Sequence, residues 1–508
     1  MKDNLTKRAS LTFVSRALEQ LSRFIINFFV TPIIIRTLGA ELYGVWTMIP
    51  QAIGYFANSD LRPLGTLKYT LASQQHNTDI NGMRRQIGAS ILLWAYTFPF
   101  FVAVGVGLIW ATPYIIHTTH ENTRTIQLAM AIMVGGTVLD KILSLPLIIL
   151  RGMNLEYKAM GLNTITVILV GLFTVIVLWF GWGLIGVALA SIFCIVINSI
   201  VRFIVARKAL PWIGIAKPKK PEFTEFTKRS LWLFILGLGE LMLYRSDLLF
   251  VGIILGPSKA AIYATTGTAL RLLMGPVEQF ASSSASGIAG LCGQKNWYRI
   301  NSVRNEISII AIVCMAIVGT GVLVLNKYFL TLWVGEEYYG GNLLNLLLVL
   351  IAFETILFRV DSIILDGLLV FRNRSIVTIS SGIITLILGG LLTYLFGLVG
   401  MAIGVFFGRL FLLIYFPILI KWHGHISMNQ YSWSIMRPFS VACVLLLGGY
   451  MLFYVIQPLH PQTWLMFLTL TIILFFITAS FILTVGLGRS ERNFLTKRIT
   501  VILDSKHL

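Results

Sequence analysis

Charged residues are scarce in this chain. They make up 12% of its 508 residues, against roughly 25% in soluble proteins. Hydrophobic residues make up 56% and come in continuous runs of about 18–25, the length that crosses a ~30 Å hydrocarbon core as a helix. The runs do not alternate over ten residues, which disfavours a membrane β-barrel. The composition therefore predicts an all-α integral membrane protein.

Cysteine and histidine are also few. The four cysteines are scattered without pairing or metal-ligand spacing, and the seven histidines fall in predicted loops or tails. The sequence has no GxxxxGK[ST] nucleotide-binding loop and nothing that resembles a catalytic triad. We therefore expect a protein that is not an enzyme and that needs no cofactor or metal.

The apolar runs predict about 14 transmembrane helices. They lie near residues 11–35, 43–67, 86–110, 124–150, 159–180, 184–206, 229–252, 261–287, 304–327, 342–370, 377–396, 398–420, 437–457 and 463–486. The predicted domains are an N-terminal six-helix lobe (1–206), a basic cytoplasmic inter-lobe linker (207–228), a C-terminal six-helix lobe (229–420), helices 13 and 14 (421–486) and a cytoplasmic tail (487–508). We expect the first run to stay in the protein as its first helix.

The chain also repeats itself once. Leu38-Gly39 with Tyr43 matches Leu255-Gly256 with Tyr263, residues 148–152 match 363–367, and residues 183–190 match 397–404. The three pairs are separated by nearly the same number of residues, which chance seldom produces. Two similar bundles that face a shared cavity are the general plan of an alternating-access transporter. The two six-helix lobes are therefore predicted to be pseudo-repeats, and the repeat points to transport.

Lysine and arginine predict the orientation. With the N-terminus in the cytoplasm, the outer loops hold Arg36, Arg124, Lys259 and Lys327, and most of the other basic residues lie on the cytoplasmic side. The positive-inside rule then places both termini and the linker in the cytoplasm. The net charge of +19 follows from this sidedness, and no nucleic-acid motif accompanies it. We expect no nucleic-acid partner.

Charges inside the predicted spans are the most informative residues. A charge at the bilayer centre costs at least ~2.5–3.5 kcal/mol, so it normally faces a cavity or a partner. Helical spacing places Arg16, Glu19, Arg23 and Asn27 on one face of the first span, and Gln51, Tyr55, Asn58 and Arg62 on one face of the second, beside Asp60. Other charged positions are Glu240, Arg245 and Asp247 in span seven, Arg271 and Glu278 in span eight, and Glu354, Arg359 and Asp361 in span ten.

Two interpretations of these charges stay open. They could be structural ion pairs, such as Arg16 with Glu19 or Arg271 with Glu278. Alternatively, they line a cationic cavity, because the planar donor fork of arginine suits phosphate or carboxylate. The second interpretation predicts substrate binding by Arg16, Arg23, Arg62, Arg245, Arg271 and Arg359, with Glu19, Asn27, Asn58, Asp60 and Glu278 as polar cavity residues.

The N-terminal region has a distinctive order of features. A polar-marked first helix leads to the outer segment TLGAELYGVW at 37–46, and the second helix ends near Ser59-Asp60-Leu61. This order resembles the start of a polysaccharide-type flippase. With two six-helix lobes and two extra helices, the chain resembles the multidrug/oligosaccharidyl-lipid/polysaccharide (MATE-like) exporter superfamily, and within it the O-antigen-type flippases of bacterial inner membranes. It departs from them in one respect, since such proteins commonly continue with glycines where this chain has Arg62-Pro63.

The resemblance implies a flippase that moves an undecaprenyl-pyrophosphate-linked oligosaccharide, an O-antigen or related polysaccharide repeat unit, across the bacterial inner membrane by alternating access. Its partners would be that lipid-linked substrate, membrane lipids, a polysaccharide polymerase and glycosyltransferases. Buried carboxylates can take up H⁺ or bind Na⁺, so Glu240, Asp247, Glu354 and Asp361 are candidates for ion coupling. A peptidoglycan lipid-precursor flippase and a drug or cation antiporter remain alternatives, although an antiporter would need an acidic, largely cation-free pocket.

Overall fold

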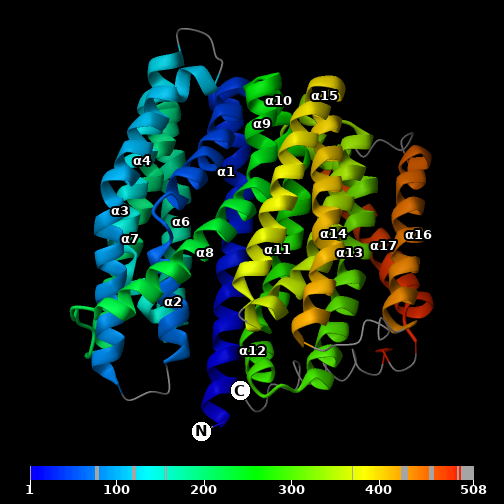
Figure 1. Cartoon of the computed structure of the whole chain (residues 1–508). Coiled ribbons are helices and arrows are strands. Elements are labelled where there is room, and N and C mark those ends of the chain that lie inside the picture. Colours follow the sequence, from blue (N-terminus) through cyan, green and yellow to red (C-terminus); the bar gives the residue numbers. More distant parts are fainter. Residues whose placement is uncertain are drawn as a thin grey trace. The chain divides into compact units, whose positions relative to one another are not determined.

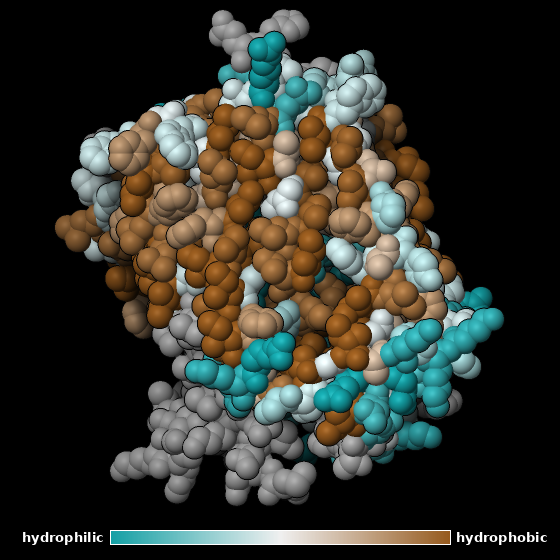
Figure 2. Space-filling model, turned by 90° about the vertical axis from the view of Figure 1, so that its left-hand side faces the viewer, coloured by the Kyte–Doolittle hydropathy of each residue, from teal (hydrophilic) through white to brown (hydrophobic). Residues whose placement is uncertain are grey.

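The computed structural model is entirely helical apart from connecting segments, within the residues that it describes, and the all-α prediction is confirmed. Those are residues 2–488 and 491–492 without 75–78, 117–121, 154, 156, 369, 425–432 and 457–462; in α1, the side chains are described from Glu19 onwards. Nine of the described helices are long and apolar enough to cross a membrane. Figure 2 shows one face on which apolar side chains cover the middle and hydrophilic side chains gather at the lower end. This is the surface of a multi-pass membrane protein.

The chain forms two compact units, Met1–Ala261 and Ile262–Leu508 (Figure 1). The first contains α1 (Lys2–Asn58), α2 (Pro63–Ser73), α3 (Ile80–Ile115), α4 (Thr123–Leu143), α5 (Leu145–Gly152), α6 (Tyr157–Trp179), α7 (Gly183–Ala209), α8 (Lys220–Tyr244) and α9 (Ser246–Leu255). Helix α10 (Pro257–Thr266) crosses the boundary between the units. The second unit contains α11 (Thr268–Ser283), α12 (Ala285–Gly293), α13 (Trp297–Trp333), η2 (Glu336–Tyr338), α14 (Asn342–Gly367), α15 (Phe371–Gly424), α16 (Trp433–Ile456), α17 (Trp464–Phe481) and the π-helical turn η5 (Ile482–Gly486).

Two of the longest helices are each divided by a glycine. Helix α1 is interrupted at Gly39, where φ is 73°, and α15 is interrupted at Gly397, where φ is 62°. A residue with a side chain is strained at such angles, whereas glycine adopts them freely. Each glycine therefore separates two helical segments that the sequence predicts as successive spans.

The local geometry of the two halves follows the internal repeat. Gly39 and its repeat partner Gly256 both have positive φ, 73° and 91°, directly after a leucine. A Cβ on Gly152 of α5 would lie 2.8 Å from the Leu71 side chain of α2, and a Cβ on its partner Gly367 of α14 would lie 3.3 Å from the backbone of Ala289 in α12. Each glycine thus lets one helix pack closely against a short helix. In the first half α5 packs against α2, and in the second half α14 packs against α12.

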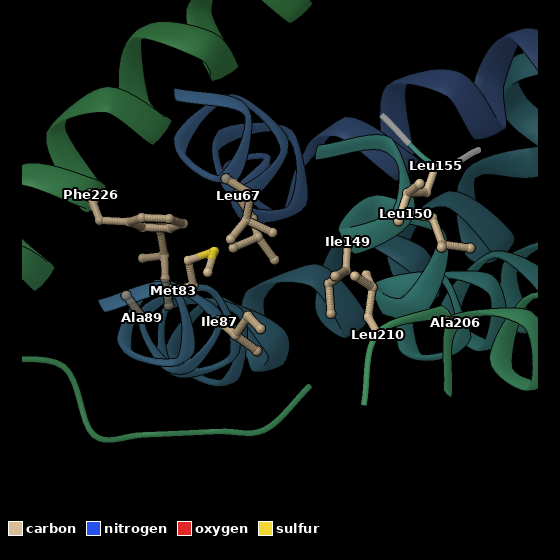
Figure 3. Close-up of a cluster of buried hydrophobic side chains, with 12 residues drawn as sticks. Leu67, Met83, Ile87, Ala89, Ile149, Leu150, Leu155, Ala206, Leu210 and Phe226 are labelled. Carbon is tan, nitrogen blue, oxygen red and sulfur yellow. The ribbon is translucent and has the colours of Figure 1, made fainter. Parts of the chain in front are cut away.

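An apolar cluster fixes the short helix α2 in the first unit. Its buried core is formed by Leu67 and Leu71 of α2 with side chains of α3, α5, α7 and α8 (Figure 3). The ring of Phe226, from the first turns of α8, lies over Met83 of α3. Burying a side chain of this size contributes about 1.5–3 kcal/mol. The cluster therefore holds α2, and the turn that precedes it, in a defined position.

Candidate substrate-binding site

The second predicted span is broken where its polar residues are concentrated. Helix α1 ends at Asn58 and α2 begins at Pro63, so residues 59–62 form a turn. Leu61 and Arg62 have φ values of 59° and 53°, in the left-handed region that disfavours residues with a side chain. Two consecutive strained residues indicate that the surrounding contacts hold the turn in place.

Asp60 anchors this turn from inside the unit. Its carboxylate is fully buried; one oxygen accepts a hydrogen bond from the Lys141 ammonium at 2.7 Å, and the other accepts one from the backbone N–H of Arg62 at 3.0 Å. Lys141 lies on α4 and also sits 6.0 Å from the ring centroid of Phe101. The two donors satisfy the buried carboxylate, and the contact with Lys141 ties α4 to the turn. Asp60 is therefore a structural anchor in this geometry.

Arg62 points the opposite way, toward α8. Its guanidinium donates to the backbone carbonyl of Leu233 at 3.3 Å and lies 3.8 Å from the carboxylate of Glu240. Both charged side chains remain about one-third exposed, at 36% and 34%. A Cβ on Gly237 would lie 2.4 Å from the guanidinium and 2.8 Å from the Asn58 amide oxygen, so glycine at 237 makes the space that these groups occupy.

Asn58, four residues before Arg62, leaves a donor unused. The residue is 7% exposed, and its Nδ2 has no hydrogen-bond partner within the part of the chain that the structure describes. A buried amide donor without a partner costs free energy of about 1–3 kcal/mol. Because this donor is buried, the group at this turn that an oxyanion can reach is the one-third exposed guanidinium of Arg62.

The other polar residues of this face extend the contact with α8 and α9. Tyr55 hydrogen bonds to Ser246, and Arg245 donates to the Pro50 carbonyl at 3.1 Å and to the Gln51 amide oxygen at 3.5 Å. Deeper in the unit, Thr66 of α2 and Ser230 of α8 share a 2.7 Å hydrogen bond. Asp247 of α9 is half-buried. The polar face predicted from helical spacing, with Gln51, Tyr55, Asn58 and Arg62, thus lies along α8 and α9. We call this contact the polar seam.

The structure describes the polar face of the first predicted span from Glu19 onwards. Arg23 pairs with Glu19 at 2.8 Å within α1, and the arginine side chain is 53% exposed while that of Glu19 is 19% exposed. Asn27 is exposed one turn later. The side chain of Arg16 lies outside the described residues, so its predicted pairing with Glu19 stays a prediction. Arg23 is thus an accessible cation on the polar face of this helix.

In the second unit, Arg271 of α11 folds back toward the last turn of α10 and the start of its own helix. Its guanidinium donates to the carbonyl of Ala264 and, at 3.4 Å, to the hydroxyl of Thr268. Glu278 is half-buried, and no ion pair joins it to Arg271 in the described structure. The predicted meeting of Arg271 with the arginines of spans one and two stays a prediction.

Glu354 and Asp361 lie on the same helix, α14, but in contrasting surroundings. Asp361 receives two hydrogen bonds from Arg304 of α13, at 2.6 and 2.7 Å, and both side chains are buried. Glu354 is 5% exposed, and neither of its carboxylate oxygens has a hydrogen-bond partner among the described residues. The opposite charge that acts on it is Arg409 of α15, whose guanidinium donates to Thr355 at 2.8 Å. Of the predicted ion-coupling residues, Glu354 is the acid with unused oxygens.

Arg359 occupies an intermediate position on α14. It is half-buried, and its Nε lacks a hydrogen-bond partner within the described part of the chain. Near the end of α14, Asp366 contacts Arg374 of α15, which also donates to Ser362 at 2.7 Å.

The sequence does not reveal the partners that neutralise several of these charges. Lys141 lies inside the predicted span 124–150, yet nothing in its spacing links it to Asp60. Arg304 is the first residue of the predicted span 304–327, whereas α13 starts earlier, at Trp297, and buries it. A lysine or arginine within or at the start of an apolar run is the signal that points to both.

The architecture is shared with transporters of known structure. A MATE structure in the bent conformation is 16% identical, with a TM-score of 0.56 over 82% of this chain and 94% of that one. An outward-facing multidrug resistance MATE family transporter of the MOP superfamily is 18% identical, with a TM-score of 0.58 over 82% and 96%. A MOP superfamily transporter from Pyrococcus furiosus, described as having a binding pocket of reversed polarity, is 16% identical, with a TM-score of 0.55 over 82% and 96%. At these identities the likeness concerns the fold.

The fold and its apolar surface define a multi-pass, all-helical membrane protein with a MATE-like architecture. No curated protein matches the sequence. Residues 12–285, more than half of the chain, match the model of the family described as Polysaccharide biosynthesis protein, and the chain belongs to that family.

Proposed function

We propose that this protein is a flippase that moves an undecaprenyl-pyrophosphate-linked oligosaccharide, an O-antigen or related polysaccharide repeat unit, across the bacterial inner membrane. The family is one of polysaccharide biosynthesis, and the fold is one that transporters use. Fourteen spans in two six-helix lobes, with both termini cytoplasmic, would provide the two bundles that alternating access requires.

The observation that carries the proposal is the position of Arg62. It stays about one-third exposed, on a turn anchored by Asp60 and Lys141. A planar guanidinium suits a phosphate or an acidic sugar. Glu240, 3.8 Å away, would balance the charge of Arg62 when no cargo is bound. Arg23 supplies a second accessible cation in the same unit.

Ion coupling is assigned in this proposal to Glu354. A buried carboxylate without a hydrogen-bond partner is stabilised when it binds a proton or a cation, because either neutralises a charge that burial disfavours. Asp361 is less suited, since its bidentate contact with Arg304 already satisfies it. Glu240 and Asp247 lie on the polar seam and remain candidates.

Transport of a lipid-linked glycan by the purified protein in proteoliposomes tests this function. The proposal expects a polyprenyl-pyrophosphate oligosaccharide to become accessible on the opposite leaflet, and deletion of the gene to trap it on the inner leaflet. Two outcomes would favour the alternatives instead. Death of the deletion strain with accumulated cell-wall precursor indicates a peptidoglycan lipid-precursor flippase, and a selective gain of drug sensitivity indicates an antiporter.

A further inference from the structure

The segment between α7 and α8 is an extended strap held against the start of α3. Ala216 donates its backbone N–H to the carbonyl of Arg84 at 3.2 Å, and Arg84 donates from Nε to the carbonyl of Trp212 at 3.0 Å. A Cβ on Gly88 would lie 2.0 Å from the Ala216 carbonyl oxygen. The absence of a side chain at 88 therefore allows the backbone of the strap to lie directly on the helix.

An extended segment places alternate side chains on opposite faces. Gly214, Ala216 and Pro218 approach Arg84 or Gly88 of α3. Ile215, Lys217 and Lys219 are exposed, and the exposed fraction of Ile215 is 70%. The three outward residues form one row with an apolar residue at one end and two ammonium groups beside it; we call it the 215–219 row.

The acids close to this row are already engaged. Glu222 accepts from Arg85 at 3.1 Å and from the backbone N–H of Lys219 at 3.0 Å, and Asp79 pairs with Arg85 at 3.4 Å. In the described structure no carboxylate pairs with the ammonium group of Lys217 or Lys219. The row therefore presents positive charge outward without an internal counterion.

Exposed aromatic residues on α3 indicate the level of the row relative to a membrane. Tyr96, Trp110 and Tyr114 are 67–70% exposed, and they are separated by 14–18 residues, or about 21–27 Å of helix, close to the thickness of a hydrocarbon core. Gly88 precedes Tyr96 by eight residues, about 12 Å. The strap on Gly88 thus lies where lipid headgroups would be, with an apolar residue and cations pointing away from the protein.

We propose that the 215–219 row binds anionic phospholipid headgroups, with Lys217 and Lys219 on the phosphate and Ile215 in the interface. Charge complementarity selects this occupant, because juxtamembrane lysines attract acidic lipids. The contact would fix the strap, and through Gly88 the start of α3, to the membrane surface.

Native mass spectrometry of the full-length protein with phosphatidylglycerol, and with phosphatidylcholine of the same acyl chains, tests the proposal. The double variant K217Q/K219Q should retain phosphatidylglycerol about 25-fold less well than the original protein, since each lysine contributes about fivefold near an acidic surface. The matched control R299Q/K421Q removes equal charge from two exposed residues outside the strap and should bind normally. Gly88→Ala should also weaken binding, although it changes no charge.

Three results would overturn the proposal. One is equal loss in the control variant, and another is equal retention of the two lipids by the original protein. The third is displacement of phosphatidylglycerol from the row by a polyprenyl pyrophosphate at equimolar concentration, which would make the row a cargo site. The measurement involves no transport, so its failure leaves the proposed flippase untouched.

Discussion

The ammonium group of Lys141 lies 2.7 Å from the fully buried carboxylate of Asp60, whereas Arg62, two residues further on, faces Glu240 at 3.8 Å with both side chains one-third exposed. The two ion pairs flank one strained turn and differ in solvent access. The buried pair of Asp60 with Lys141 stabilises the fold, because separating it leaves an uncompensated buried charge. In the partly exposed pair of Arg62 with Glu240, an incoming anion can replace the carboxylate as the partner of the guanidinium.

Breaking the buried ion pair of Asp60 with Lys141 should destabilise the protein. Asp60→Asn or Lys141→Ala alone is expected to cost about 3–5 kcal/mol, because each leaves an uncompensated buried group. The double change Asp60→Asn with Lys141→Met should recover much of that loss. Thermal unfolding of the purified proteins measures it, and single variants as stable as the original would contradict the structural role.

Glycine at the two strained positions should separate stability from function. Leu61→Gly and Arg62→Gly each relieve a left-handed conformation and should raise stability by up to about 1 kcal/mol. Leu61→Gly should keep transport, whereas Arg62→Gly should lose it together with the guanidinium. Proteoliposome assays and unfolding midpoints report the two effects. Normal transport by Arg62→Gly would refute a cargo-binding role for this arginine.

Arg23 provides a test of the cationic face of α1. Since its side chain is 53% exposed, Arg23→Ala should leave protein abundance unchanged and abolish surface glycan. Lysine should restore export only in part, because a point charge does not reproduce a bidentate phosphate contact. If the pair with Glu19 were structural instead, Arg23→Ala would lower abundance, and the added change Glu19→Ala would restore function.

Glu354 and Asp361 form a matched pair on α14. Glu354→Gln removes the ionisable group but keeps the shape, so the variant should fold, carry cargo down its gradient and lose ion-driven accumulation. Asp361→Asn should instead reduce protein level, since Arg304 would lose one of its two acceptors. Counterflow and ion-jump assays distinguish these outcomes. Accumulation by Glu354→Gln at the original rate would exclude the coupling role.

The orientation can be checked by cysteine labelling. In a background without the four native cysteines, an impermeant maleimide added outside should miss Ile215→Cys and Thr500→Cys but label Thr118→Cys. The expectation rests on the sidedness of lysine and arginine. External labelling at 215 would reverse the topology.

Helical spacing accounts for much of the candidate site. Gln51, Tyr55, Asn58 and Arg62 share a face in the sequence, and the structure places that face along α8 and α9. Spacing could not reveal that the helix stops at Asn58, because the apolar run continues beyond it. The one indirect indication of the left-handed turn is the resemblance, which leads us to expect glycines where this chain has Arg62-Pro63, because glycine adopts positive φ freely.

The sequence by itself determined that the chain is all-helical and membrane-spanning, and which faces are polar, because these properties depend on local hydropathy and on the helical period. That its two halves share a plan stays a prediction from the internal repeat. The tertiary structure alone decided which charges are neutralised. Asp60 meets Lys141 and Asp361 meets Arg304 across long stretches of chain, and such pairings depend on how helices pack. Their consequence is that Arg62, Arg23 and Glu354 stand out from a larger set of charges that looked alike in the sequence.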